Sequence, residues 1–210
     1  MANTASSSIY EKLLITKDGR EVNIVGKVST FDYFESILSP NVTANLSFVD
    51  TGDSLKDEKI NAQGTIYNTL PITGGEEIKY KIGQLEGSLF NNAANNVNQE
   101  SQRETVMMSL ISKEGLENYN IANSRKYSGN ITDSVKKIVK SSFNTVDSKL
   151  DFDKTSNGYA FVGSNDTPFE LIIELASKST FGGGNPGFFF YQTRAGFKYK
   201  AIDNLIKQEP

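Results

Sequence analysis

The 210-residue sequence contains no cysteine, no histidine and no tryptophan. Without cysteine the chain has no disulfide framework and no thiolate that could attack a substrate or hold zinc or an iron–sulfur cluster. Without histidine it has no imidazole base near neutral pH, which excludes Ser-His-Asp and Cys-His catalytic schemes. The chemistry that remains is that of carboxylates, lysines or an all-oxygen metal site. We therefore expect a protein that is not an enzyme and that uses no cofactor.

The sequence also lacks a long apolar run and a strong excess of one charge. No segment approaches the roughly 18–20 apolar residues of a membrane-spanning helix, and residues 1–8 lack the basic and apolar regions of a secretory signal. Residues 1–105 carry 9 Lys and Arg against 14 Asp and Glu, and residues 106–210 carry 13 against 11. Neither half has the dense basic stripe of a nucleic-acid-binding protein. A mildly acidic surface would instead let a polyanion pass without binding.

The first half has the pattern of short strands separated by turns. Residues 9–16 and 21–28 are apolar segments on either side of Asp18-Gly19, a pair typical of a tight hairpin turn. Apolar and polar residues alternate strictly over residues 42–49, which predicts a half-buried strand. Further strands are predicted at residues 63–67, 77–82 and 87–90. Strands at this spacing are typical of an antiparallel sandwich or barrel.

Two segments of the first half are less regular. Phe31, Phe34 and Leu38 would line one face of a helix, but residues 31–38 fit an extended strand equally well, and Pro40 ends the segment in either case. Residues 91–102 are rich in asparagine and weakly apolar. They predict a loop or connector.

From about residue 106 the pattern includes helices. Apolar residues recur at helical spacing between Ile131 and Val139, and either Asn130 or Thr132 can cap that helix. The sequence Thr167-Pro-Phe-Glu170 is a capping box with proline at the first helical position, so a second helix begins there. A hairpin of aromatic strands follows, over residues 188–191 and 197–202. The second half therefore predicts two helices packed on a small sheet.

Carboxylates are the remaining candidates for catalysis or metal binding. Oxygen ligands for calcium could come from Asp50, Asp53, Asp57 and Glu58, but their spacing fits no EF-hand loop. Asp151 and Asp153 would share one face of a strand, whereas a glycosidase pair normally faces across a cleft from separate elements. We interpret them as charges at the edge of a strand. No catalytic, cofactor-binding or metal-binding residue is assigned.

A glycine run and an aromatic run could suggest ligand binding. Residues 182–184 are three glycines, but they lack the Gly-Lys-Ser/Thr ending and the following helix of a phosphate-binding loop, so they predict a turn. Residues 188–191, Phe-Phe-Phe-Tyr, and Tyr199 could stack nucleic-acid bases. A continuous aromatic strand is more typical of a hydrophobic core, and we interpret it so.

The order of several segments resembles the baseplate hub proteins of contractile-tailed, T-even-type phages and the related hub domains of type VI secretion spikes. The similar segments are a helix after a Gly-containing turn (127–139), the next helix (166–178), the aromatic hairpin (187–202), the end of that domain (205–210) and the opening strands (28–50). None is a catalytic signature, and the specific feature is their order along one chain. The resemblance implies that residues 31–38 are extended.

The resemblance implies an α+β chain of two domains. Residues 1–105 would form a tail-tube-like antiparallel β-barrel, and residues 106–210 a small α/β domain with two helices packed on a sheet. Such hubs also contain a second tube domain, which is missing before Pro210, as are the strands that normally return to complete the first tube domain. The resemblance therefore implies that the chain is a fragment of a longer hub.

The implied role is structural. The hub would join the tail tube to the central spike in the baseplate of the virion, after assembly in the host cytoplasm. It would form a homotrimer in its full-length form and contact the tail tube protein, the spike protein and other baseplate proteins. Genomic DNA would pass through its channel without specific binding.

Two other functions remain as alternatives. Clustered exposed tyrosines and asparagines would favour a carbohydrate-binding β-module of a tail fibre or adhesin. A carboxylate-based cell-wall hydrolase would lose its activity when Asp151 or Glu174 is replaced.

Overall fold

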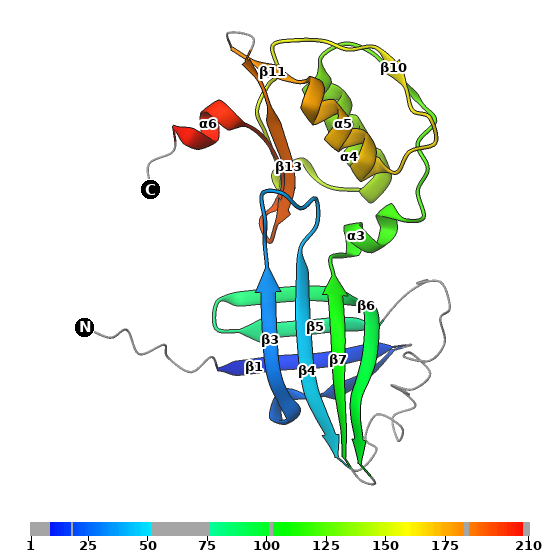
Figure 1. The fold of residues 1–210 in the computed structure, drawn as a ribbon, viewed down its shortest axis with the longest axis vertical. Coiled ribbons are helices and arrows are strands. Elements are labelled where there is room, and N and C mark those ends of the chain that lie inside the picture. The colour runs from blue at the N-terminus through cyan, green and yellow to red at the C-terminus, as the bar shows by residue number, and fades with distance from the viewer. Residues whose placement is uncertain (1–8, 18, 52–75, 101–102, 183–184, 208–210) are drawn as a thin grey trace, which may run out of the picture. The chain divides into compact units, whose positions relative to one another are not determined.

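The computed structural model describes residues 9–17, 19–51, 76–100, 103–182 and 185–207. The chain forms two compact units (Figure 1). The first comprises residues 1–34 and 43–113, and the second comprises residues 35–42 and 114–210. In the part of the chain that is described, no helix is both long and apolar enough to cross a membrane.

The first unit is a seven-stranded antiparallel sheet with the strand order β2-β1-β5-β6-β7-β4-β3. Its strands are β1 (Tyr10–Lys17), β2 (Arg20–Asn23), β3 (Val28–Phe34), β4 (Thr43–Thr51), β5 (Glu77–Ile82), β6 (Leu85–Glu100) and β7 (Arg103–Ile111). Lys17 pairs with Arg20, as expected for the predicted two-residue hairpin, and β4 and β5 confirm two further predictions. The strand predicted at residues 63–67 lies outside the described residues. The predicted domain boundary at residues 105 and 106 falls within β7.

The long strand β6 pairs with one neighbour along its first part and with another along its second part. Its first residues, up to Phe90, pair with β5, and from Phe90 onwards it pairs with β7. The register with β7 shifts between Asn91 and Ala93 and again between Asn96 and Asn98. Such bulges bend a strand, and β1 and β5 run across the direction of β3, β4 and β7 (Figure 1).

The predicted loop at residues 91–102 is therefore wrong, because β6 continues to Glu100. Asparagine disfavours a regular strand, but pairing with β7 supplies the hydrogen bonds that local preference does not. The buried Asn91 also donates a hydrogen bond of 3.0 Å to the carboxylate of Glu76, which is 2% exposed. Lys17 donates to the same carboxylate at 2.6 Å.

The described strands do not form a closed barrel, since β2 and β3 are the two edges of the hydrogen-bonded order. The two edge strands are joined by the short 3₁₀ helix η1 (Val25–Lys27), so one chain segment pairs with β1 at its start and with β4 at its end. The prediction that residues 31–38 are extended holds as far as Phe34, and the helical alternative is wrong. Alternate residues of the strands form the core: Leu13, Ile15, Ala44, Leu46, Phe48, Ile78, Tyr80, Val106, Met108 and Leu110 are all buried.

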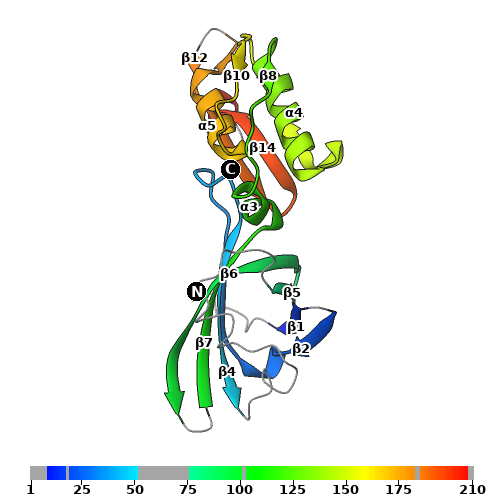
Figure 2. The ribbon, with the colours of Figure 1, turned by 90° about the vertical axis from the view of Figure 1, so that its right-hand side faces the viewer.

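The second unit contains helices and small sheets. Its helices are α3 (Lys113–Asn118), α4 (Ile131–Phe143), η2 (Asp147–Lys149), α5 (Pro168–Lys178) and α6 (Ile202–Ile206). Its strands are β8 (Lys126–Tyr127), β9 (Leu150–Phe152), β10 (Phe161–Val162), β11 (Thr180–Phe181), β12 (Asn185–Pro186), β13 (Phe188–Thr193) and β14 (Gly196–Ala201). The main sheet has the order β13-β14-β9, and β9 runs parallel to β14. Figure 2 shows α4 and α5 from a second direction.

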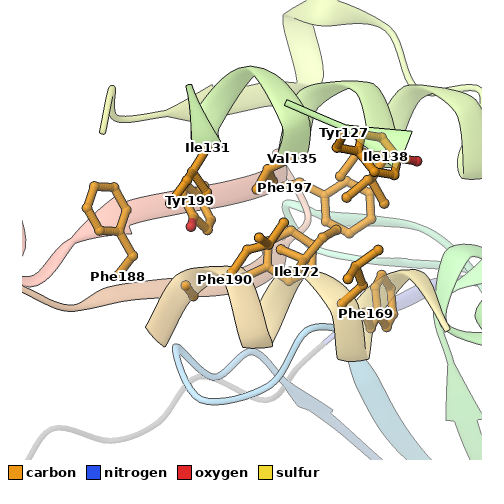
Figure 3. Close-up of a cluster of buried hydrophobic side chains, with 14 of the residues drawn as sticks. Tyr127, Ile131, Val135, Ile138, Phe169, Ile172, Phe188, Phe190, Phe197 and Tyr199 are labelled. Carbon is orange, nitrogen blue, oxygen red and sulfur yellow. The ribbon is translucent and has the colours of Figure 1, made fainter. Parts of the chain in front are cut away.

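Helices α4 and α5 and the strands β13 and β14 share one hydrophobic core (Figure 3). The apolar residues predicted to line one face of α4 are fully buried: Ile131, Val135, Ile138 and Val139. Asn130 caps α4, because its side-chain oxygen accepts a hydrogen bond of 3.1 Å from the amide of Thr132. The predicted capping box starts α5, where the Glu170 carboxylate accepts hydrogen bonds from the amide and the hydroxyl of Thr167 at 3.0 and 2.8 Å.

Candidate functional site

A cluster of charged side chains lies on the face of the main sheet opposite the helices. Successive residues of a strand point to opposite faces, so Phe197 and Tyr199 enter the core while Lys198 and Lys200 lie on the other side. The parallel strand β9 places Asp151 directly beside Lys198. The carboxylate of Asp151 binds Lys198 at 2.8 Å and Lys200 at 2.5 Å.

Asp153 completes this group, which we call the β9–β14 charge cluster (Asp151, Asp153, Lys198 and Lys200). Its carboxylate lies 3.2 Å from the ammonium of Lys200. It also accepts hydrogen bonds from the amide of Ala201 at 3.0 Å and from the side chain of Asn204 at 2.9 Å. Asp153 therefore fixes the point at which β14 passes into α6.

The electrostatics of this cluster favour ion pairing over catalysis. Hydrogen bonds from Lys198 and then from Lys200 hold the pKa of Asp151 below its usual value, so the carboxylate stays ionised at neutral pH. Burial alone would lower the pKa of Lys200, but its bonds to Asp151 and Asp153 outweigh burial and raise that pKa. A general acid needs a raised carboxyl pKa, and a nucleophilic amine needs a lowered one. Asp151 and Lys200 have the opposite shifts, and the ion pairs of the cluster hold β9 against β14.

Glu174, the other carboxylate considered for hydrolysis, is also paired. It accepts a hydrogen bond from Lys178 on the next turn of α5, and this bond is the largest cause of the raised pKa of Lys178. The ammonium of Lys178 lies 4.7 Å from the centroid of the Tyr159 ring, which in turn stacks on Phe161 at 5.6 Å. A small pocket of about 150 Å³ lies beside these side chains. The Tyr159 ring that lines it thus already contacts a cation and a second ring.

The other candidates from the sequence fall in different places. Asp53, Asp57 and Glu58 lie outside the described residues, as does the side chain of Asp50. The described residues contain no group of three acidic side chains close enough to hold a metal ion. Gly182 follows the strand β11, and the other two glycines of the run, at 183 and 184, lie outside the described residues.

The aromatic hairpin forms part of the core. Phe188, Phe190 and Tyr199 are at most 6% exposed, and their rings contact other core rings (Figure 3). The hydroxyl of Tyr199 lies 2.6 Å from that of Ser179, and burial raises the pKa of Tyr199. These rings are not available to stack on bases.

One surface feature was not predicted from the sequence. The strand β8, the residue on either side of it and the helix α4 line a groove of about 560 Å³, which we call the basic groove: Arg125, Lys126, Tyr127, Ser128, Lys137, Lys140 and Ser141. The sequence shows Lys137 and Lys140 on one helical face, but only the fold brings Arg125 and Lys126 beside them. The groove gathers four cationic side chains in one concave surface.

Comparison with known proteins shows similarity of fold. No family model and no curated protein matches the sequence. The structure is similar to the 43 kDa tail protein of prophage MuSo2 from Shewanella oneidensis, with a TM-score of 0.55 and 13% identity over 90% of this chain and 54% of that chain. It is also similar to a tail protein from Neisseria meningitidis MC58, with a TM-score of 0.53 and 11% identity over 90% of this chain and 49% of that chain.

A third similar structure is a component of the Escherichia coli type VI secretion system, itself described as structurally similar to two bacteriophage T4 tail proteins. It has a TM-score of 0.49 and 9% identity over 93% of this chain and 47% of that chain. This chain spans about half the length of these three proteins. The first two matches confirm, at the level of the fold, the resemblance to phage tail proteins inferred from the sequence.

Proposed function

We propose that this chain is a structural part of a phage tail baseplate hub, which joins the tail tube to the central spike around the channel for DNA. The observation that supports this best is the likeness to two tail proteins over 90% of the chain, a span that includes residues of both units. The order of the motifs, from opening strands to capped helices to aromatic hairpin, is the order expected of such hubs.

The chemistry of the described residues supports a structural role. Asp151, Asp153 and Glu174 form ion pairs with lysines, and the pKa shifts of Asp151 and Lys200 keep both groups charged.

In the first unit, one segment from β2 to β3 pairs with both β1 and β4. We propose that this unit is the tube-like domain of the hub, and the second unit its α/β domain.

The proposed assembly is a closed ring of three copies in the full-length protein. Heterologous contacts that close on themselves give cyclic oligomers. The partners would be the tail tube protein, the central spike protein and other baseplate proteins, with genomic DNA passing through the channel without specific binding. The protein would be found in the tail baseplate of the virion, after assembly in the host cytoplasm.

Electron microscopy of particles that carry a tagged copy of the protein tests its location. A hub protein places the tag on the tail axis at the baseplate, whereas a carbohydrate-binding fibre module places it at the periphery and would contradict the proposal. Sedimentation of the full-length protein, alone and with the neighbouring spike protein, tests the assembly. A trimer is expected, and a protein that stays monomeric with the spike present would refute the hub assignment.

A further inference from the structure

We propose that the basic groove binds an acidic segment of a partner protein. The hub role assigns no ligand to this surface, and the inference depends only on the residues of the second unit that line it. Lys126 lies in the strand β8 and Arg125 directly precedes it, and Lys137, Lys140 and Ser141 come from α4. Its volume of about 560 Å³ lies in the range of roughly 300–1,000 Å³ that is typical of ligand sites.

The walls of the groove are held by the core beneath them. Tyr127 is 7% exposed, its ring stacks on Phe161 at 5.1 Å, and its hydroxyl contacts the side chain of Asn123 at 2.8 Å. On the other wall, Ile138 and Val139 are fully buried and fix the rotation of α4. The backbone of both walls is thus set before any ligand arrives, and only the long cationic side chains need to adjust. Such preorganisation lowers the entropic cost of binding.

The charges in the groove are mostly uncompensated. Lys140 pairs with Asp147 at 2.6 Å, but Asp147 is 76% exposed and does not line the groove. For Arg125, Lys126 and Lys137 there is no ion pair among the described residues, although Asp133 lies one turn before Lys137 on α4. Like charges in one concave surface raise the local concentration of anions. A ligand that brings several negative charges would relieve their repulsion.

Carboxylates of a protein segment fit this surface better than a nucleic acid does. The one aromatic ring that lines the groove, Tyr127, stacks on Phe161 and is 7% exposed, so it offers no open face for a base. The whole chain carries a net charge of −3, which opposes a long polyanion but hardly affects a short acidic segment.

Fluorescence polarisation with three labelled probes tests the proposal on the full chain. The probes are a short polyglutamate peptide, a polyglutamine peptide of equal length and an oligothymidylate of equal charge. Polyglutamate should bind at low ionic strength, weaken as salt is added, and bind more tightly than the other two. The double variant Lys126→Glu, Lys137→Glu should lower its affinity at least about tenfold. Lys154→Glu makes the same type of change in the same unit outside the groove and should alter affinity less than about twofold.

Three results would overturn the proposal: no binding of polyglutamate, an equal loss in Lys154→Glu, or tighter binding of oligothymidylate that the double variant abolishes. The last would identify a nucleic-acid site. Circular dichroism of each variant checks that it is folded. If the charge reversal unfolds the chain, Lys126→Gln with Lys137→Gln keeps the test decisive, since neutralisation should still weaken polyglutamate binding about threefold or more.

Discussion

The side-chain oxygen of Asn118 accepts a hydrogen bond of 2.9 Å from the backbone amide of Phe169, 51 residues further along the chain. Phe169 lies in the first turn of α5, where backbone amides have no partner within the helix. Asn118 is the last residue of α3 and is 6% exposed. The short helix α3 thus supplies a buried cap to α5, in addition to the capping box within α5 itself.

Replacing Asn118 with alanine should destabilise the second unit by roughly 1–2 kcal/mol, because the amide of Phe169 would lose its buried acceptor. Chemical denaturation followed by circular dichroism measures the effect. Asn120→Ala is the matched control, since Asn120 is exposed and its side chain caps no helix in the described structure. Equal stability of the Asn118 and Asn120 variants would show that the bond contributes nothing.

Thr167→Ala should cost roughly 1 kcal/mol through loss of the hydroxyl that donates to Glu170. Thr167→Ser keeps the hydroxyl and should retain most of the stability. The same denaturation experiment compares the two variants with the parent chain. A serine variant as unstable as the alanine variant would mean that the methyl group of Thr167, and not its hydroxyl, matters.

These two caps show what local sequence can and cannot predict. The capping box is contained in four consecutive residues, and the alternation of β4 in eight, so both could be predicted from sequence alone. The cap from Asn118 depends on the packing of α3 beside α5, which no local pattern encodes. The same holds for the basic groove, whose two walls are brought together by the fold.

The strand β6 shows the opposite error, in which a local pattern misled. Its asparagine-rich sequence predicts a loop, yet β7 provides a partner strand over its whole second part. The bulges near Asn91 and Asn96 absorb the irregularity. Tertiary pairing overrode local preference there, as it commonly does in sheets.

Glu76→Ala should destabilise the first unit by roughly 2 kcal/mol. The buried amide of Asn91 would lose its acceptor at the bend of β6, and Lys17 would lose its ion pair. Lys17 is 38% exposed and can be rehydrated when Glu76 is removed, whereas Lys17→Ala leaves the buried Glu76 carboxylate without its cation, so Lys17→Ala should cost at least as much as Glu76→Ala. Urea unfolding of both variants, with Glu86→Ala as an exposed control on β6, decides the order. A Lys17→Ala variant as stable as the parent would contradict the importance of the ion pair to the buried Glu76 carboxylate.

Gly196→Ala should prevent stable folding of the second unit, with a cost of more than about 4 kcal/mol. Gly196 has a φ of 126°, and a Cβ there would lie 2.2 Å from the backbone oxygen of Lys149. Gly182→Ala separates backbone strain from steric clash, because Gly182 has a φ of 56° but open space around it. It should cost only about 1 kcal/mol. Thermal melts of the two variants measure the difference. If they were equally stable, the contact with Lys149 would not constrain the turn between β13 and β14.

The β9–β14 charge cluster should make stability depend on pH in the acidic range. The pKa of Asp151 is lowered in the folded state, so its contribution is fully present above the unfolded value of about 3.9 and is lost as the pH falls through the folded pKa. Because Asp151 is 52% exposed, the contribution at neutral pH should be less than about 1 kcal/mol. Asp151→Asn should therefore be slightly less stable than the parent at neutral pH and equally stable in strong acid.

Unfolding free energies of both proteins across this pH range measure the convergence. The same comparison in a background carrying Lys198→Gln and Lys200→Gln is the control. Those lysines are the two largest causes of the lowered pKa, so the difference attributable to Asp151 should shrink at every pH. A difference that persists unchanged without the lysines, or that grows as the pH falls, would show that Asp151 stabilises the sheet by some means other than its ion pairs.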